Sequence, residues 1–361
     1  MPITIVRKHA SSSVRLSIHH EAHEGHEVFL SIEEPHDVNG GAPSLRSESI
    51  APGGRDPPFC MLKIRQFFQN GFRPHPVGAT EWLIMRVLFA ALILWDLYAP
   101  GPYVFSSQPS PQGIAKIFDL TWLNQPWARG FVLITAGVAS VFYIWGQRIA
   151  LLASLPVLFS LATIVRTYEN SQGFTDHSHQ LIALTLLAQT IVVWTLFFKR
   201  HHQQYRDRAM EYGWLLFYSQ GTIAATYVVA AMSKIMRSTG MWVFNSPYLA
   251  LDLVKSKRQN YYKYLDEELA TDPEKAVWVF ENPNLARVLF GGAFFLELFA
   301  LFALRNRPWA LAVGVGLIAM HRGIRWMMGL NFLTAELIVA VFLLNIPFWA
   351  AWIFSRGRKT L

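Results

Sequence analysis

Long apolar runs separated by short polar segments recur along the chain from about residue 80 onwards. Each run has about 20 residues, the length that a helix needs to cross a hydrocarbon core of about 30 Å. The pattern therefore predicts an all-α fold, a polytopic integral membrane helix bundle with about eight transmembrane helices. The predicted spans are 81–99, 127–146, 149–167, 178–198, 213–236, 286–304, 309–328 and 331–353, the last kinked or ended early at Pro347.

The segment before the first span has a different composition. Residues 1–60 are rich in Ser, Gly, Pro, Glu and His, which predicts a disordered tail ahead of a membrane domain at 61–361. Because the globular pattern starts at Met61, this residue is a candidate initiator. Residues 63–73 are basic and amphipathic, as expected of a helix on an anionic membrane surface. Nothing in the tail would preorganise a metal site around the histidines of the run HHEAHEGHE, which are His19, His20, His23 and His26.

Composition agrees with a membrane protein and excludes several other classes. Of 361 residues, 52% are hydrophobic and 16% charged, and 13 Trp and 12 Tyr suit aromatic belts at the two interfaces. A net charge of +8 would suggest nucleic-acid binding in a soluble protein. Here the basic residues lie in short loops, so membrane lipid and not nucleic acid is the expected partner. The single cysteine, Cys60, allows no internal disulfide and no thiolate metal cluster.

The distribution of Lys and Arg predicts the orientation of the spans. Basic residues concentrate in alternate short loops, which are cytoplasmic by the positive-inside rule. Both termini are therefore expected in the cytoplasm, and 100–126, 168–177 and the long segment 237–285 on the extracytoplasmic side. The inner loops hold Lys63, Arg65, Arg73, Arg148, Lys199, Arg200, Arg206, Arg208, Arg305, Arg307, Arg356, Arg358 and Lys359.

Polar residues gather at the outer ends of three predicted spans. His177 opens the fourth span, Lys234 ends the fifth and His321 lies near the end of the seventh. Ionisable groups at such depth are tolerated next to one another or beside a water-filled cavity, which predicts a shared extracytoplasmic cavity. Desolvation disfavours the charged form of a lysine there, so Lys234 is a candidate general base. The structural alternatives are that Lys234 snorkels to the interface and that His177, with His179, caps a helix.

Other polar residues lie deeper in the predicted spans. Arg86 and Asp96 are about 15 Å apart along the first span and are expected to hold neighbouring helices rather than each other. Glu297 falls in the middle of the sixth span, where a carboxylate is neutral or paired. Gln220 and Tyr227 lie along the fifth span, where hydrogen bonds between helices are their usual role.

Several of these residues, in this order over about 270 residues, make up a pattern: Arg86-Val87-Leu88-Phe89 through Trp95-Asp96, Gly146-Gln147-Arg148-Ile149, Asp176-His177-Ser178, the run YVVAAMSK from Tyr227 to Lys234, then Trp242, Glu297, His321 and Met328-Gly329. The pattern resembles the horizontally transferred transmembrane domain family, which includes the membrane part of vitamin K-dependent gamma-carboxylase and its bacterial relatives. The resemblance implies a bacterial inner-membrane protein.

The resemblance also implies a chemistry and a set of cofactors. A lysine matching Lys234 would deprotonate a reduced quinone, vitamin K hydroquinone or menaquinol, oriented by His177 and supported by His321. The oxygenated quinol would then take a proton from a glutamate side chain so that carbon dioxide can add, with O2 and CO2 as co-substrates. An apolar cleft between helices suits such a quinone, with Tyr227, Gln220 and Trp242 as candidate binding residues. This is carboxylase-like lyase chemistry.

The chain departs from the family in ways that leave a second function open. Ser233-Lys234 stand where the family has paired lysines, and the resemblance covers the membrane part alone. Recognition of a secreted peptide or protein substrate would then use segment 237–285 or partner subunits. The alternative function is a non-enzymatic membrane component in the maturation, export or immunity of a secreted peptide. No phosphate-binding or dinucleotide-binding glycine motif is found in the sequence.

Overall fold

The computed structural model describes residues 71–98, 109–171, 180–199, 207–264 and 274–357. The chain divides into two units, Met1–Asp56 and Pro57–Leu361, and every described residue belongs to the second. The described residues are helical and contain no strand, which confirms the all-α class. The predicted tail, its histidines, Met61, most of the predicted surface helix and His177 lie outside the described residues.

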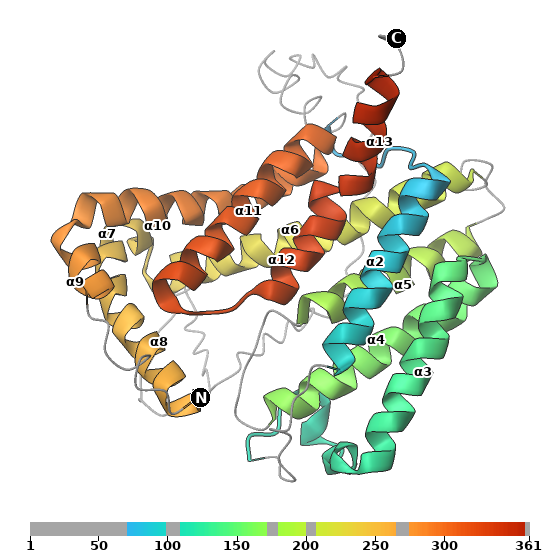
Figure 1. The fold of residues 1–361 in the computed structure, drawn as a ribbon, viewed down its shortest axis with the longest axis horizontal. Coiled ribbons are helices and arrows are strands. Elements are labelled where there is room, and N and C mark those ends of the chain that lie inside the picture. Colours follow the sequence, from blue (N-terminus) through green and yellow to red (C-terminus); the bar gives the residue numbers. More distant parts are fainter. Residues whose placement is uncertain (1–70, 99–108, 172–179, 200–206, 265–273, 358–361) are drawn as a thin grey trace, which may run out of the picture. The chain divides into compact units, whose positions relative to one another are not determined.

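The first half of the domain consists mainly of long helices (Figure 1). Successive helices from α3 to α6 pack side by side, and α2 packs against α3. Two short 3₁₀ turns, Gly113–Lys116 and Thr121–Asn124, lie between α2 and α3. The long helices are α2 (Ala79–Tyr98), α3 (Pro126–Trp145), α4 (Arg148–Asn170), α5 (Gln180–Phe198) and α6 (Arg208–Arg237), each overlapping a predicted span.

The second half contains shorter and more interrupted helices. Within the predicted extracytoplasmic segment 237–285 lie α7 (Trp242–Asn245), a 3₁₀ turn (Ser246–Tyr248), α8 (Leu249–Tyr264) and α9 (Glu274–Glu281). A small separate core joins them to the helices that follow, through Leu253, Val279, Ala286 and Met327. The remaining elements are α10 (Pro283–Leu298), a 3₁₀ turn (Ala300–Leu304), α11 (Arg307–Met328), α12 (Leu333–Val339), a π-helical turn (Ala340–Leu344) and α13 (Ile346–Gly357).

Four of the described helices, α3 to α6, are long and apolar enough to cross a membrane, and a fifth span results if α12 and α13 are counted together. Three other predicted spans differ in composition or length. Helix α2 carries Glu81, Arg86 and Asp96, and α11 carries Arg322 and Arg325. Helix α10 has 16 residues, about 24 Å by helical rise and shorter than a hydrocarbon core. The count of eight spans remains a prediction.

The break in the last predicted span lies two residues earlier than Pro347. The π-helical turn is followed by Asn345, whose φ of 47° is left-handed, and the axes of the helices before and after this residue differ by 42°. Pro347 lies instead in the first turn of α13, where a missing N–H leaves no hydrogen bond unmade. Asparagine tolerates the left-handed conformation better than most residues, so Asn345 rather than Pro347 makes the bend.

The main core binds the two halves of the domain together. Phe89 of α2 is fully buried and packs edge-to-face against Tyr143 of α3 and Phe342 of the π-helical turn, with ring centroids 6.3 and 5.0 Å apart. Trp82 is also buried on α2. The same core includes residues of α4, α5, α6 and α11. Helix α2 is therefore packed within the bundle, although its charges set it apart from a plain apolar span.

Candidate functional site

Helix α6 positions the residues that the sequence singles out. It has 30 residues, and Asp207 caps its start by accepting a hydrogen bond from the Ala209 N–H at 2.9 Å. Tyr227 and Lys234 are seven residues apart, two turns of helix, so they share one face about 10 Å apart. The last turn therefore brings Lys234 to the end of the helix with Tyr227 behind it.

Lys234 forms an ion pair that sequence reasoning left open. Its ammonium contacts the carboxylate of Glu297 on α10. The Glu297 side chain is 8% exposed and that of Lys234 30% exposed, so the pair lies at the edge of the buried interior. The Lys234 ammonium also lies 5.1 Å from the centre of the Trp242 ring, a cation–π distance, and Trp242 stacks on Phe294, one turn before Glu297.

Tyr227 of α6 contacts His321 of α11. The Tyr227 hydroxyl lies 3.3 Å from His321 Nε2, and His321 is 4% exposed. The imidazole stacks on Phe332, with ring centroids 5.0 Å apart and planes at 15°. Its Nδ1 is buried without a hydrogen-bond partner among the described residues. A buried polar atom without a partner is costly, which makes this nitrogen a candidate ligand contact.

A second buried carboxylate lies beyond His321. Glu336 of α12 is 3% exposed, and its Oε2 lies 2.7 Å from Nη2 of Arg322, close enough for an ion pair but without the angle of an aligned hydrogen bond. The Tyr227 side chain lies within electrostatic range of both Glu297 and Glu336. Sequence reasoning missed Glu336, although an acid within the apolar run 331–353 is a signal that could have found it.

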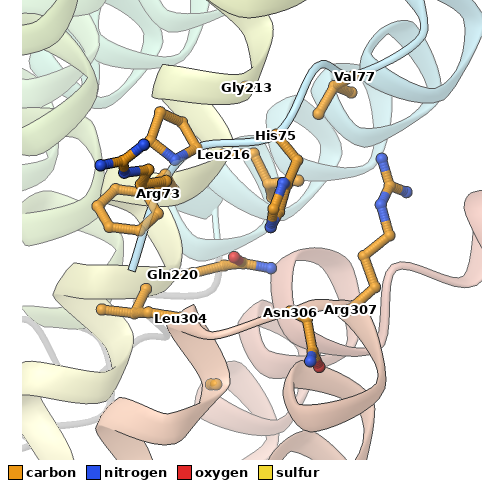
Figure 2. Close-up of a pocket in the computed structure, with 12 residues that line it drawn as sticks. Arg73, His75, Val77, Gly213, Leu216, Gln220, Leu304, Asn306 and Arg307 are labelled. Carbon is orange, nitrogen blue, oxygen red and sulfur yellow. The ribbon is translucent and has the colours of Figure 1, made fainter. Parts of the chain in front are cut away.

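Gln220 lies in a different part of the fold (Figure 2). It is 14 residues before Lys234, about 21 Å along α6, and its amide donates a 2.8 Å hydrogen bond to the Phe342 carbonyl. It borders a small cavity of about 30 Å³, the share of one water molecule, at the predicted cytoplasmic side. Arg73, His75 and Arg307 line the same cavity. The structure thus does not bring Gln220 to Lys234, Tyr227 or Trp242.

The remaining candidate residues join helices away from Lys234. Arg86 donates to the Tyr143 carbonyl at 3.1 Å, and Asp96 pairs with Arg166 of α4 at 2.7 Å. Arg166 also contacts Glu169. These contacts link α2 to α3 and α4.

Arg148 does more than carry a charge in a predicted inner loop. At the start of α4 its guanidinium donates to both carboxylate oxygens of Glu211, with one N–O distance of 3.0 Å. The Glu211 side chain is only 4% exposed, and Arg208 lies 3.4 Å from one of its oxygens. This ion pair joins α4 to α6.

The described residues contain no group of His, Cys, Asp and Glu that could hold a metal ion. The cluster at the end of α6 instead combines an amine, two carboxylates, a phenol and an imidazole, which are groups that take up and release protons. No family model, curated protein or solved structure matches this chain. Its function therefore has to be argued from this cluster.

Proposed function

We propose that the chain is a membrane-embedded protein with quinol-dependent, carboxylase-like chemistry, in which Lys234 acts as general base at the outer leaflet. The single observation behind the proposal is the ion pair of Lys234 with Glu297, beside Trp242 and near Tyr227 and His321. A lysine paired with a mostly buried carboxylate has a local proton acceptor. The apolar pattern adds the eight-span count to the proposal, the distribution of Lys and Arg adds the outward-facing site, and the family resemblance adds the bacterial inner membrane.

The pair can supply a free amine without a net change of charge. Transfer of one ammonium proton to the Glu297 carboxylate leaves a neutral amine and a neutral acid. The amine can then accept a hydroxyl proton, becoming an ammonium again. Trp242 contacts the charged ammonium before the transfer, and the acid keeps the first proton at Glu297 afterwards.

The residues of the cluster fit a reduced quinone, which is an apolar ring with two hydroxyl groups. Trp242 and Phe294 offer stacked aromatic faces, and the unpartnered Nδ1 of His321 offers a buried polar contact. When bound, the quinol would supply the hydroxyl proton and the electrons that reduce O2. Lys234 would take that proton while Glu297 keeps the first one, and His321 and Tyr227 would orient the ring. His177 joins this set through the family resemblance alone.

The test is quinol-dependent oxygen consumption in proteoliposomes supplied with menaquinol. Lys234→Ala should lower the rate by about 10²- to 10⁴-fold, the usual contribution of a general base. Lys275→Ala is the matched control, because Lys275 makes a similar cation–π contact with Trp326 at 4.9 Å outside this cluster. Lys234→Ala leaves the Glu297 carboxylate without its partner. The double variant Lys234→Met/Glu297→Gln removes that carboxylate as well, and it should stay folded but inactive. Wild-type turnover in Lys234→Ala would end the proposal.

The bound lipid provides a second measurement. The full chain purified in mild detergent should carry a quinone in near-stoichiometric amount by mass spectrometry, and Lys234→Ala should still carry it. Repeated absence of any quinone, with peptide maturation or immunity that tolerates Lys234→Ala and depends on segment 237–285, would favour the non-enzymatic alternative.

A further inference from the structure

A groove between α5 and α6, far from Lys234 along α6, holds a combination of groups that the proposed function does not use. Its volume is about 340 Å³, at the lower end of the roughly 300–1,000 Å³ of small-ligand pockets. One wall is a single face of α5 that includes Ile191 and Thr195 and is continued by Lys199, just after the helix. The other wall is formed by Trp214 and Tyr218 of α6, whose rings stack with centroids 5.8 Å apart.

The chemistry of the groove changes from apolar to cationic along its length. In the apolar part of the groove, Ile191 is 58% exposed. Lys199 follows the last residue of α5 and is exposed at the end of the same face. None of the residues that line the groove is acidic. Within the described part of the chain, no carboxylate pairs with the Lys199 ammonium, so its charge is available to a ligand.

The geometry points to an anionic glycerophospholipid as the occupant, with an acyl chain in the groove and its phosphate at Lys199. An acyl chain packed on Ile191 and Thr195 would cover the apolar surface of the groove. Trp214 and Tyr218 have amphipathic rings, which are favoured at the depth of the lipid headgroups. The lysine supplies charge complementarity to the phosphate. With the predicted orientation, this end of α5 and α6 faces the cytoplasmic leaflet, which carries the anionic lipids.

Native mass spectrometry of the full chain in mild detergent tests the site. The probes are phosphatidylglycerol and phosphatidylcholine with identical acyl chains, each titrated separately. The wild type should retain phosphatidylglycerol more tightly, and Lys199→Gln should weaken it by about five-fold, the effect of one basic residue near an anionic surface, with phosphatidylcholine unchanged. Thr195→Phe, which fills the groove at an exposed position, should weaken both lipids. Lys255→Gln, an exposed lysine of α8, should change neither.

The site itself is mapped by phosphatidylglycerol with a photoreactive acyl chain. Cross-links should concentrate in the peptides that contain Ile191, Thr195 and Trp214, and Thr195→Phe should remove them. Equal retention of the two lipids by the wild type, or unchanged retention in Lys199→Gln, would overturn the inference. Cross-links spread evenly over the helices would also overturn it, as would dimers of the chain that Thr195→Phe abolishes, because a second copy would then cover the groove.

Discussion

Arg86 lies over the carboxyl end of α3, where the last carbonyl groups of a helix lack intrahelical partners. Its guanidinium donates to the Tyr143 carbonyl, and its positive charge complements the helix dipole. The helix ends at Gly146 in the left-handed conformation, with a φ of 71°. A Cβ at Gly146 would stand 1.4 Å from Nη1 of Arg86. Backbone conformation and close approach therefore both require glycine at this position.

Gly146→Ala should lower the free energy of unfolding by at least about 2 kcal/mol, because the left-handed conformation costs about 1–2 kcal/mol and the Arg86 contact is lost in addition. Thermal unfolding in detergent measures the change. Gly137→Ala is the control in the same helix, where an added Cβ meets nothing within 4 Å. That variant should be neutral or stabilised by about 0.5–1 kcal/mol. Equal stability of the two variants would contradict this account of Gly146.

The Asp96–Arg166 pair is the most buried ion pair described, with side chains 1% and 9% exposed. Asp96→Ala should cost about 3 kcal/mol, near the lower end for a broken buried pair, since Glu169 still partners Arg166. The double variant Asp96→Leu/Arg166→Met should be less destabilised than Asp96→Ala, measured by denaturation in detergent. Arg208→Ala, with a side chain 41% exposed, should cost under about 1 kcal/mol. A double variant as unstable as the single one would refute the prediction.

Sequence reasoning found the members of the candidate site better than their partners. Lys234 and Tyr227 are visible as polar residues at helical spacing in one apolar run. The pairing of Lys234 with Glu297 depends on how α6 and α10 pack, which periodicity does not encode. Gln220 looked equivalent to Tyr227 along the chain, but it lies seven residues before Tyr227, on the side away from Lys234, which puts it about 21 Å from Lys234 along α6.

At the scale of elements, the sixth predicted span changes character at Glu297. The α-helix ends at Leu298 and continues as a 3₁₀ turn, Ala300–Leu304. The other end of α10 packs in the small core with α8 and α9, through Ala286. Hydropathy treats 286–304 as one uniform run, because it cannot see that part of the run is covered by protein. The paired carboxylate thus lies where the helix geometry changes.

The bend at Asn345 is tied to α2 and α11 through the side chain of Glu81. Asn345 Nδ2 donates to Glu81 of α2 at 2.6 Å, and Glu81 pairs with Arg307 of α11 at 2.7 Å. Asn345→Gly keeps the left-handed backbone but loses a hydrogen bond to a charged group, at a cost of about 1.5–3 kcal/mol. Asn345→Ala should lose about 1–2 kcal/mol more, because alanine disfavours that backbone. Calorimetric unfolding of both variants gives the comparison.

The control for Asn345 is the other non-glycine residue with a positive φ among those described, Thr239 at 50°. A β-branched residue is strained there, so Thr239→Gly should stabilise the protein. If Asn345→Gly is no less stable than the wild type, the hydrogen bond to Glu81 contributes nothing. If Asn345→Ala equals Asn345→Gly, the backbone conformation is not what fixes the bend.

At the scale of the whole molecule, the apolar pattern predicted helix positions well because each run must satisfy its backbone hydrogen bonds within itself. The number of membrane crossings is less accessible to sequence. Charges on α2 and α11 lower their apolar character, and they are compensated by contacts such as Asp96–Arg166 that only the folded bundle supplies. A hydropathy window counts such charges as exposed to lipid.

The topology gives the prediction that separates eight crossings from five. In a Cys60→Ser background expressed in a bacterial host, single cysteines are introduced at exposed positions and treated with a membrane-impermeant maleimide. Eight crossings with both termini inside predict that Ser110→Cys and Glu281→Cys are labelled in intact cells. Gln147→Cys and Pro308→Cys should be labelled only after lysis, because both lie in predicted inner loops.

Pro308 decides the count, since it lies in the first turn of α11, shortly after α10. If α10 does not cross, Pro308 stays on the same side as Glu281, and both cysteines are labelled in intact cells. Labelling of Gln147→Cys and Pro308→Cys in intact cells, without labelling of Ser110→Cys and Glu281→Cys, would instead reverse the orientation and place Lys234 at the cytoplasmic leaflet. Full labelling of every variant in permeabilised cells is the control for access. The position of Pro308 thus determines whether Glu297 lies on a helix that crosses the bilayer or on one that enters from the outer side and turns back.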